Sequence, residues 1–490
     1  MRKAFLVAFF GGLALGFWPS VGGANKKVPT FSKEVVRIFQ QNCQACHHPG
    51  YIAPFSLMTY EEAKPYARAI KEAVLDGRMP PWKAAQGCGD FYDARILSAA
   101  DKQTIVDWVD AGAPEGDPRD LPEPIEFPGG WMLGEPQVEL KSPEAFRVPP
   151  TGNDIYRCFR VSEPFTEDRY VTAAEILPDK AAVTHHVLLF IDSRGDSVAL
   201  DERDEGPGYN CFGGPGFVPN GGLGGWAPGN FPRFAPEGIA TKVPKGARVV
   251  MQVHYHPNGT EQLDQTRVGL HFSDKPVNSN LSYLPIFNFT FQLQPGNKNQ
   301  KVTASLILPF DIKVIGVTPH MHLLGKQMKI EARLPNGKRQ CLVNVPKWDF
   351  RWQGTYVYKE PVKLPMGTLI KLTAFYDNSA ENPNQPNHPP KVVRWGEQTT
   401  DEMCLAFLSY VRDDRSLTAS QQEEERRLLS PVIKMGGVNL VDQVRLKLQS
   451  ALYSTSPVEM YNFSSGFSRA ELLKMPWKEL FGESPKPSCH

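Results

Sequence analysis

The sequence predicts a multidomain protein with a small all-α domain, two all-β sandwiches of jelly-roll-like architecture and a short helical C-terminal extension. Three observations lead to this prediction. A chain of 490 residues is too long for a single hydrophobic core. Helical patterns are confined to the two ends, whereas the middle alternates short strands with turn residues. The 44 prolines and 41 glycines are spread along the chain, which is typical of β-rich domains with many turns.

The net charge excludes some partners. It is +1, and no basic run occurs anywhere in the chain. Nucleic acids and anionic membrane surfaces are therefore poor candidates.

Residues 1–24 are expected to be a cleaved signal peptide. Arg2 and Lys3 precede an apolar run from 4 to 17, and small residues at 22–24 suit a cleavage site. The apolar run is shorter than the ~20 residues of a spanning helix, although an uncleaved anchor remains the alternative. We expect an exported protein, periplasmic or extracellular, with no transmembrane segment after cleavage.

Residues 31–116 are predicted to form the α domain. Ser32 can cap a helix that reaches Gln40. The capping box Thr59-Tyr-Glu-Glu62 opens a second helix, which ends at Gly77. Ser98 opens a third helix.

A haem attachment motif lies between the first two of these helices. Cys43-Gln-Ala-Cys46-His47 places two cysteines two residues apart, followed at once by a histidine. In c-type sites both thiols bond to the haem and the imidazole binds the iron. A redox dithiol or a zinc knuckle is the alternative, but neither needs His47. The motif predicts one covalently attached haem c, and residues 31–116 resemble a small class I cytochrome c over their whole length.

A methionine is expected as the second axial ligand of this haem. Met79 lies on a proline-stiffened loop after the second helix, where its thioether could reach the iron. Met58 is the competing candidate.

Residues 117–150 are rich in proline and are predicted to be a linker. Such linkers are extended and semi-rigid, so we expect this one to hold the α domain near the rest without fixing it.

The two sandwiches are predicted at residues 151–280 and 281–412, followed by the helical extension at 413–490. Strands are expected at residues 170–173, 186–191, 248–253, 303–308 and 371–376.

Two pairs of histidines are spaced like metal ligands on strands. His320 and His322 stand two apart in an apolar, β-branched stretch, and His254 and His256 stand two apart in another. Residues two apart on a strand point to the same face, so each pair can converge on one ion. For His254 and His256, a half-buried strand with polar alternation is the alternative.

A third pair, His185 and His186, is adjacent in sequence. Neighbouring residues on a strand face opposite ways, so one ion can bind both only if the strand end is bent or bulged. Otherwise one ring faces inward and the other makes a hydrogen bond. Single histidines, such as His271 and His388, are expected to be structural or exposed.

Four motifs occur in an order that resembles the type II copper, ascorbate-dependent monooxygenases. They are His-His-x-Leu-Leu-Phe, Gln-Val-His-Tyr, His-x-His-x-Leu-Gly-Lys and Asp-Glu-Met-Cys. The resemblance implies two copper ions. One would be held by His185, His186 and His254. The other, the catalytic ion, would be held by His320, His322 and Met403.

The resemblance also implies a mechanism. The copper ions would lie on different sandwiches across an open, solvent-filled cleft. The ion at Met403 would bind O2 and abstract a hydrogen, and the other ion would supply the second electron. A soft thioether ligand favours Cu(I), the form that meets O2. Gln252 matches a residue near the family's electron route, although an ordinary strand glutamine is the alternative.

Three departures from the family bear on the substrate. Thr318, Leu405 and Phe407 replace the residues with which the peptide-amidating members bind a carboxylate, and none of the three can pair with one. A peptide carboxylate is therefore disfavoured, and a less charged small molecule is the better hypothesis. Leu405 and Phe407 are also open to interpretation as sandwich core.

These predictions combine into one functional hypothesis. The chain would be a copper monooxygenase that hydroxylates a C–H bond with O2, and its own haem would relay electrons from a soluble reductant or another cytochrome. The alternative is a non-catalytic redox or copper-handling protein with the same ligands.

The remaining cysteines suit an oxidising compartment. By resemblance, Cys158 pairs with Cys211. Cys404 could pair with Cys341, although the family's usual partner position holds no cysteine. Cys88 and Cys489 stay unassigned.

Overall fold

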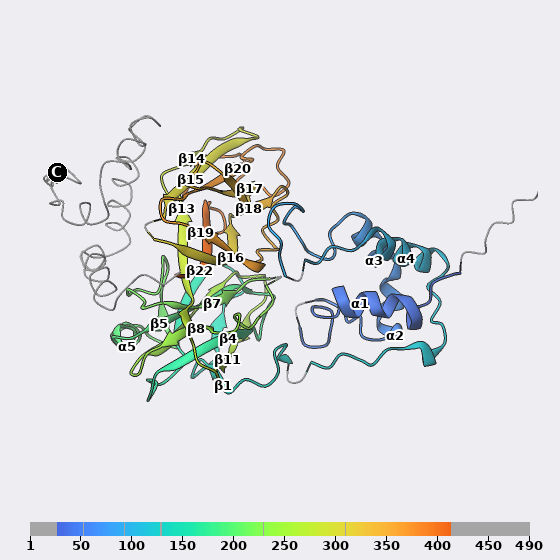
Figure 1. Ribbon diagram of the computed structural model, residues 1–490, viewed down its shortest axis with the longest axis horizontal. Coiled ribbons are helices and arrows are strands. Elements are labelled where there is room, and N and C mark those ends of the chain that lie inside the picture. Colours follow the sequence, from blue (N-terminus) through green and yellow to red (C-terminus); the bar gives the residue numbers. More distant parts are fainter. Residues whose placement is uncertain are drawn as a thin grey trace, which may run out of the picture.

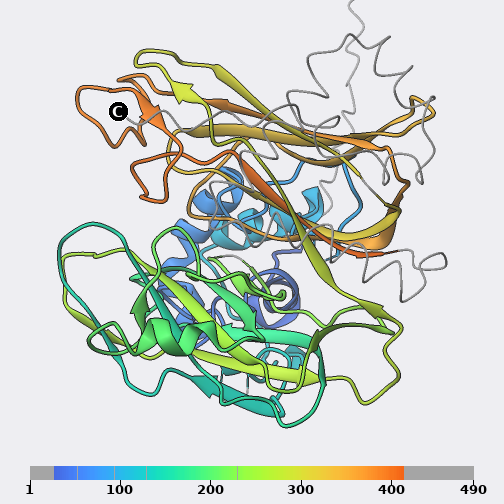
Figure 2. The ribbon, with the colours of Figure 1, turned by 90° about the vertical axis from the view of Figure 1, so that its left-hand side faces the viewer.

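The computed structural model of the protein places a small group of helices beside two stacked β-sandwiches (Figure 1, Figure 2). The structure describes residues 27–412 except 52, 93, 128–129, 229 and 309. The predicted signal peptide and the predicted extension at 413–490 therefore lie outside the described residues. Among the described helices, none has the length and apolar character needed to cross a bilayer. The chain is mostly β-sheet, as the sequence predicts.

The helical part contains short helices that mostly begin where the sequence indicates. The capping box of Thr59 and Glu62 is present, and the Ser98 side chain accepts the Asp101 N–H. The first helix begins earlier than predicted, because Thr30 is its N-cap and Ser32 is buried inside its first turn. The helices are η1 (Phe31–Val35), α1 (Val36–Asn42), α2 (Tyr60–Ala63), η2 (Lys64–Tyr66), α3 (Ala67–Leu75), α4 (Ala99–Asp110) and η3 (Pro118–Asp120).

An aromatic core holds these helices together. Phe31, Phe39 and Trp108 are almost fully buried, and the Phe39 and Trp108 rings meet edge to face with centroids 6.2 Å apart. The group therefore has a hydrophobic core of its own. The cytochrome c assignment of residues 31–116 stays a prediction.

The first sandwich has two five-stranded sheets, a two-stranded ribbon and one helix. The first sheet has the order β1 (Val138–Lys141), β11 (Arg267–Phe272), β4 (Arg169–Leu177), β8 (Ile239–Val243) and β12 (Ser279–Asn280). The second has the order β6 (Tyr209–Asn210), β3 (Ile155–Arg160), β9 (Arg248–Tyr255), β5 (Thr184–Asp192) and β7 (Gly222–Trp226). The ribbon pairs β10 (Gln262–Asp264) with β2 (Phe146–Val148), and the helix is α5 (Asp196–Asp201). Apolar side chains from both sheets form the core.

The second sandwich has two four-stranded sheets and another ribbon. The first sheet has the order β13 (Ser282–Phe287), β22 (Leu405–Arg412), β16 (Ile312–His320) and β19 (Tyr356–Leu364). The second has the order β15 (Gln300–Ile307), β20 (Leu369–Tyr376), β17 (Gly325–Arg333) and β18 (Arg339–Val345). The ribbon pairs β14 (Gln292–Leu293) with β21 (Val393–Arg394).

Four of the five expected strand segments fall within β4, β5, β9 and β20, and the segment 303–308 matches β15 except for Leu308, which follows the end of that strand. The chain passes from one sandwich to the other between β12 and β13. The range predicted as linker, 117–150, includes β1 and β2 of the first sandwich.

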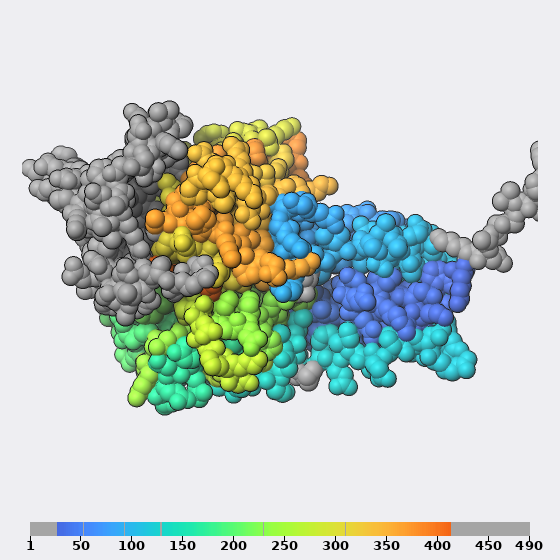
Figure 3. All heavy atoms as spheres, in the orientation of Figure 1, coloured from blue at the N-terminus to red at the C-terminus, as the bar shows by residue number. Residues whose placement is uncertain are grey.

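The helical part is fixed to the second sandwich. In Figure 3 the light-blue segment after α3 lies directly against the orange atoms of that sandwich. Ala85 donates its N–H to the Asn344 carbonyl, and the Tyr92 N–H bonds to the Val357 carbonyl, each at 2.8 Å. The Trp82 ring meets Tyr356 edge to face. The expectation of a domain held near the rest without being fixed is therefore wrong, because residues 81–92, which we call the docking segment, join the second sandwich.

The disulfides agree with the sequence interpretation at one pair and differ at another. Cys158 is bonded to Cys211, as the resemblance implies. Cys341 is bonded to Cys88 of the docking segment, so the suggested pairing of Cys341 with Cys404 is wrong. Cys404 is a buried free thiol. Cys489 lies outside the described residues.

Removing the Cys88–Cys341 disulfide should release the docking segment. In a Cys88→Ala/Cys341→Ala double variant we expect unfolding to cost about 2–5 kcal/mol less, since the cross-link closes a very long loop. Limited proteolysis should also cut residues 81–92 faster than in the parent. A Cys404→Ala variant, which removes a thiol and no cross-link, is the control. Equal cleavage in parent and double variant would contradict the prediction.

Candidate metal centres

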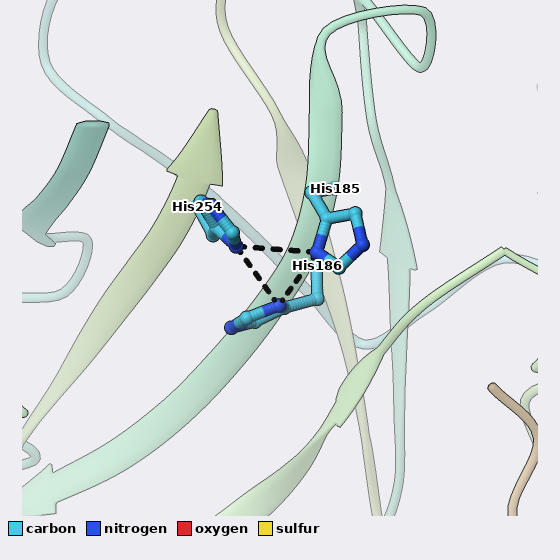
Figure 4. Close-up of side chains that lie close together, drawn as sticks. All are labelled: His185, His186 and His254. Carbon is cyan, nitrogen blue, oxygen red and sulfur yellow. Dashed lines mark hydrogen bonds between the residues drawn. The ribbon is translucent and has the colours of Figure 1, made fainter. Parts of the chain in front are cut away.

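Three histidines of the first sandwich point their rings at one another (Figure 4). His185 and His186 lie at the start of β5, and His254 lies near the end of the neighbouring β9. The Nδ1 atom of His185 is 3.1 Å from Nδ1 of His186 and 3.1 Å from Nδ1 of His254, and the third Nδ1 separation is 3.3 Å. These residues are the first centre.

A β-bulge brings the two adjacent histidines to the same side. Thr184 pairs with Tyr255 and His186 pairs with His254, so the register shifts by one residue and His185 is the extra residue. A bulge re-aims side chains in this way. The structure therefore has the bulged strand end that one ion would need to reach both rings.

Burial keeps these imidazoles neutral. It lowers the pKa of His185 and His186 well below the usual value and also lowers the pKa of His254, where Asp154 opposes the shift. Neutral imidazole is the form that binds a metal ion, and copper accepts it in both oxidation states. A point equidistant from the three Nδ1 atoms lies about 1.8 Å from each, close to the ~2.0 Å of metal–imidazole bonds. The geometry and the donor set fit a copper ion.

The second centre contains His320, at the end of β16, and His322, in the turn that follows. Nδ1 of His320 bonds to the Gln353 side-chain oxygen, and Nδ1 of His322 bonds to the Asp401 carbonyl at 3.1 Å. Both acceptors fix the proton on Nδ1, so the two Nε2 lone pairs are available to an ion. Burial lowers the pKa of His320 to about 4 and that of His322 to about 3, so both rings are neutral at pH 7.

Met403 lies on the chain segment that leads into the strand beside His320. His320 pairs with Leu405 across β16 and β22, and Met403 precedes Leu405 by two residues and is buried. Two imidazoles and a thioether form a donor set that suits copper.

A buried carboxyl group, that of Glu402, braces the second centre. Glu402 accepts backbone N–H bonds from His322 at 2.9 Å, Leu324 at 2.6 Å and Met403 at 3.1 Å. Burial raises its pKa to about 8, although these N–H groups oppose the shift. One side chain therefore holds the turn of His322 and the backbone of Met403 together.

The two centres are in side-chain contact. The Phe350 ring of the second sandwich stacks on His185 with centroids 4.5 Å apart, and its centroid is 5.7 Å from that of His322. The Gln353 amide binds His320 and lies 3.4 Å from Nε2 of His185. Phe350 and Gln353 therefore each contact a histidine of both centres, whereas the open, solvent-filled cleft that the resemblance implies stays a prediction.

The haem motif also has a feature of a ligand site. The Nδ1 atom of His47 bonds to the Phe55 carbonyl at 3.0 Å, which leaves Nε2 with a lone pair. Burial raises the pKa of Cys43 to about 12, with a contribution from Cys46, and raises the pKa of Cys46 to about 11.

Met58 and Met79 both remain candidates for the second axial ligand of the predicted haem. Met58 precedes the capping box and Met79 follows α3, where its N–H bonds to the Ala73 carbonyl. Both side chains are half-buried.

Gln252, His256 and His271 lie outside the two histidine clusters. Gln252 is buried and donates to the Cys211 carbonyl beside the disulfide. His256 is exposed and bonds to Asp154 instead of joining the first centre. His271 packs edge to face on Phe234.

Leu405 and Phe407 are not core residues. They are half-buried, and they alternate along β22 with Ala406 and Leu408, which are fully buried in the core. Leu405 is the cross-strand partner of His320, so the two lie on the same face as the second centre.

Sequence reasoning missed four residues that shape the centres. Glu402 directly precedes Met403 in the Asp-Glu-Met-Cys motif, so its position next to a candidate ligand could have singled it out. Asp154, Phe350 and Gln353 carry no local signal, because each reaches its histidine from another part of the chain.

Comparison with known proteins supports the family suggested by the motifs. The sequence model of the C-terminal domain of copper type II ascorbate-dependent monooxygenases matches residues 296–427. This range contains His320, His322 and Met403, and the match supports a copper-dependent monooxygenase. No curated protein sequence matches the chain.

Two solved structures are weakly similar. PNGF-II shares 12% identity, with 56% of this chain and 65% of that chain covered and a TM-score of 0.25. The major capsid protein P2 of bacteriophage PM2 shares 9% identity, with 57% and 99% covered and a TM-score of 0.23. The chain thus spans slightly less than two thirds of PNGF-II, and neither similarity carries an argument.

Proposed function

We propose that the chain is an exported copper-dependent monooxygenase that hydroxylates a C–H bond of a small organic molecule with O2. The observation that carries this proposal is the second centre, where two neutral imidazoles with free Nε2 atoms lie near a buried methionine within the family match. The two disulfides support an oxidising, exported location.

Each centre has a distinct proposed role. His320, His322 and Met403 would hold the catalytic ion, and the three histidines of the first centre would hold the ion that supplies the second electron. Copper, when bound, supplies one-electron redox chemistry and O2 activation, and the thioether favours its reduced form. The chain contributes orientation, since Gln353 and Asp401 hold the rings of the second centre, and Phe350 stacks on His185 of the first.

The surface beside the second centre favours an uncharged substrate. Leu405 and Phe407 face that side of the sheet, and Thr318, the partner of Phe407, bonds to the Thr355 hydroxyl. None of these three groups can pair with a carboxylate. An apolar or weakly polar small molecule fits this surface better than a peptide carboxylate.

We also propose that a c-type haem relays electrons to the copper ions. Cys43 and Cys46 would hold the haem covalently, with His47 as one axial ligand and Met79 or Met58 as the other. A soluble reductant or another cytochrome would be the donor. The docking segment supports this proposal, because it keeps the motif-bearing helices against the copper-binding part of the chain.

Oxygen consumption tests the catalytic role of the second centre. In the reduced full-length protein, Met403→Ala should abolish O2 uptake and leave the haem absorption spectrum unchanged. Met366→Ala, at an exposed methionine of the same sandwich, is the control and should keep parental uptake. Undiminished uptake in Met403→Ala would contradict the proposal.

The relay is tested by removing the haem from the intact chain. A Cys43→Ala/Cys46→Ala variant should take up copper normally but be reduced more slowly by a reduced soluble donor. Copper reduction at the parental rate in this variant would contradict the proposed electron relay.

A non-catalytic redox protein is the second candidate. The contact of His185 with Phe350 and Gln353 favours it, because groups this close can exchange electrons with no substrate between them. The oxygen assay separates the two, since an electron carrier without O2 chemistry would show no uptake even in the parent.

A further inference from the structure

We propose that Asp154 is a positioning residue that orients His254 in the first centre and couples this centre to the loop that carries Met403. The inference rests on the proposed copper sites. It concerns how the two sandwiches act on each other, which neither the motifs nor the family match addresses.

The Asp154 carboxylate is buried and has three partners. It lies immediately before β3, with its side chain 5% exposed, and Oδ2 is 3.3 Å from Nε2 of His254. Oδ1 accepts from Nδ1 of His256 at 2.6 Å, and Oδ2 accepts the Thr399 N–H at 2.6 Å. Thr399 belongs to the second sandwich, so one carboxylate joins the two sandwiches beside a candidate ligand.

The contact with His254 fixes which ring nitrogen faces the ion. Nδ1 of His254 points at the other two histidines, so the proton of the neutral ring lies on Nε2, which is 3.3 Å from the Asp154 carboxylate. A carboxylate in this position orients the ligand and raises its basicity. The Tyr156 ring stacks on the same imidazole, with centroids 4.1 Å apart and planes 15° apart. His254 is thus held at its edge by Asp154 and on its face by Tyr156.

Residues 154–156 also form hydrogen bonds with the loop that leads to the second centre. The Asp154 N–H donates to the Gln398 side chain at 3.1 Å, and the Tyr156 hydroxyl donates to the Glu397 carbonyl at 2.6 Å. Four residues after Glu397, the Asp401 carbonyl accepts from Nδ1 of His322. Residues 397–403 therefore contain both the hydrogen-bond partners of Asp154 and Tyr156 and, a few positions later, Asp401 and Met403 of the second centre.

Two consequences follow for copper binding. Loss of the Asp154 charge should weaken copper at the first centre by about 10–100-fold, the usual effect of removing such a partner from a metal ligand. Copper at the first centre should also raise the affinity of the second centre, because a fixed His254 holds Asp154 and hence Thr399 in place. Any such coupling acts equally in both directions.

Copper titration of the full-length protein tests the first consequence. Asp154→Asn keeps the size and one acceptor oxygen but loses the charge. We expect it to show the weakened first centre and an altered Cu(II) paramagnetic resonance signal. Asp192→Asn is the matched control. Asp192 is also a buried carboxylate of the first sandwich, but it bonds to Ser197 and to backbone N–H groups of a turn and to no histidine. Equal copper affinity and identical spectra in Asp154→Asn and Asp192→Asn would overturn the positioning role, whatever their thermal stabilities.

The second consequence needs a protein whose first centre cannot load. His185→Ala should lower copper affinity at the second centre, and in the Asp154→Asn background the same change should have no further effect. An unchanged second centre in His185→Ala would overturn the coupling. Failure of the proposed function itself would look different, because the reduced parent would then take up no O2 while the copper titrations of the parent and the variants could still give the expected differences.

Discussion

Replacing His320 by alanine is expected to lower the copper content from about two ions per chain to about one and to reduce C–H hydroxylation by at least about 100-fold. The second centre offers two imidazoles and one thioether, and the ring of His320 is already aligned by Gln353. Its loss leaves two donors, too few to retain the ion. Metal analysis and a product assay on the purified protein measure both effects.

The control for this variant is His388→Ala. His388 is an exposed histidine of the second sandwich, so its removal should leave both copper ions and the hydroxylation rate unchanged. Full copper content in His320→Ala would mean that His320 is no ligand.

Replacing Glu402 by alanine is expected to lower the free energy of unfolding by about 3 kcal/mol or more, because a buried donor without an acceptor costs about 1–3 kcal/mol. Three backbone donors, those of His322, Leu324 and Met403, would lose their acceptor in a fully buried place. Chemical denaturation of the metal-free protein measures the change. Metal-free protein is needed because bound copper would add its own stabilisation.

Two further variants interpret this result. Glu402→Gln keeps an oxygen that can accept two of the three N–H groups, so it should be less damaging than the alanine variant. Glu381→Ala removes an exposed carboxylate that forms an ion pair with Lys298 at the surface, and it should change stability by less than about 0.5 kcal/mol. A Glu402→Ala protein as stable as Glu381→Ala would contradict the role given to these bonds.

The sequence predicted those features of the centres that depend on local spacing. His320 and His322 do lie close together, with ring centroids 5.2 Å apart, although the expected strand ends at His320 and His322 is in the turn that follows. The bulge at His185 was one of two alternatives for adjacent histidines. The capping box at Thr59 is equally local. Each of these features is decided by residues within a few positions of one another.

The features that the sequence did not predict depend on contacts between distant segments. Asp154 meets Thr399 across 245 positions, and the Cys88–Cys341 pair spans 253. The contact between the two centres depends on Phe350, whose ring stacks on His185 from the other sandwich. The periodic pattern of residues along the sequence cannot predict such contacts, because each forms only when separate elements pack together.

The docking segment makes the helical part inseparable from the second sandwich. Phe91 packs among the buried residues of that sandwich and forms a β-bridge with Tyr358, while Cys88 supplies half of a disulfide. A chain shortened to begin at the first sandwich would expose the tyrosine and leave Cys341 as a free thiol. The two parts therefore do not behave as interchangeable modules: replacing the helices by another domain would require the recipient sandwich to be rebuilt around Tyr358.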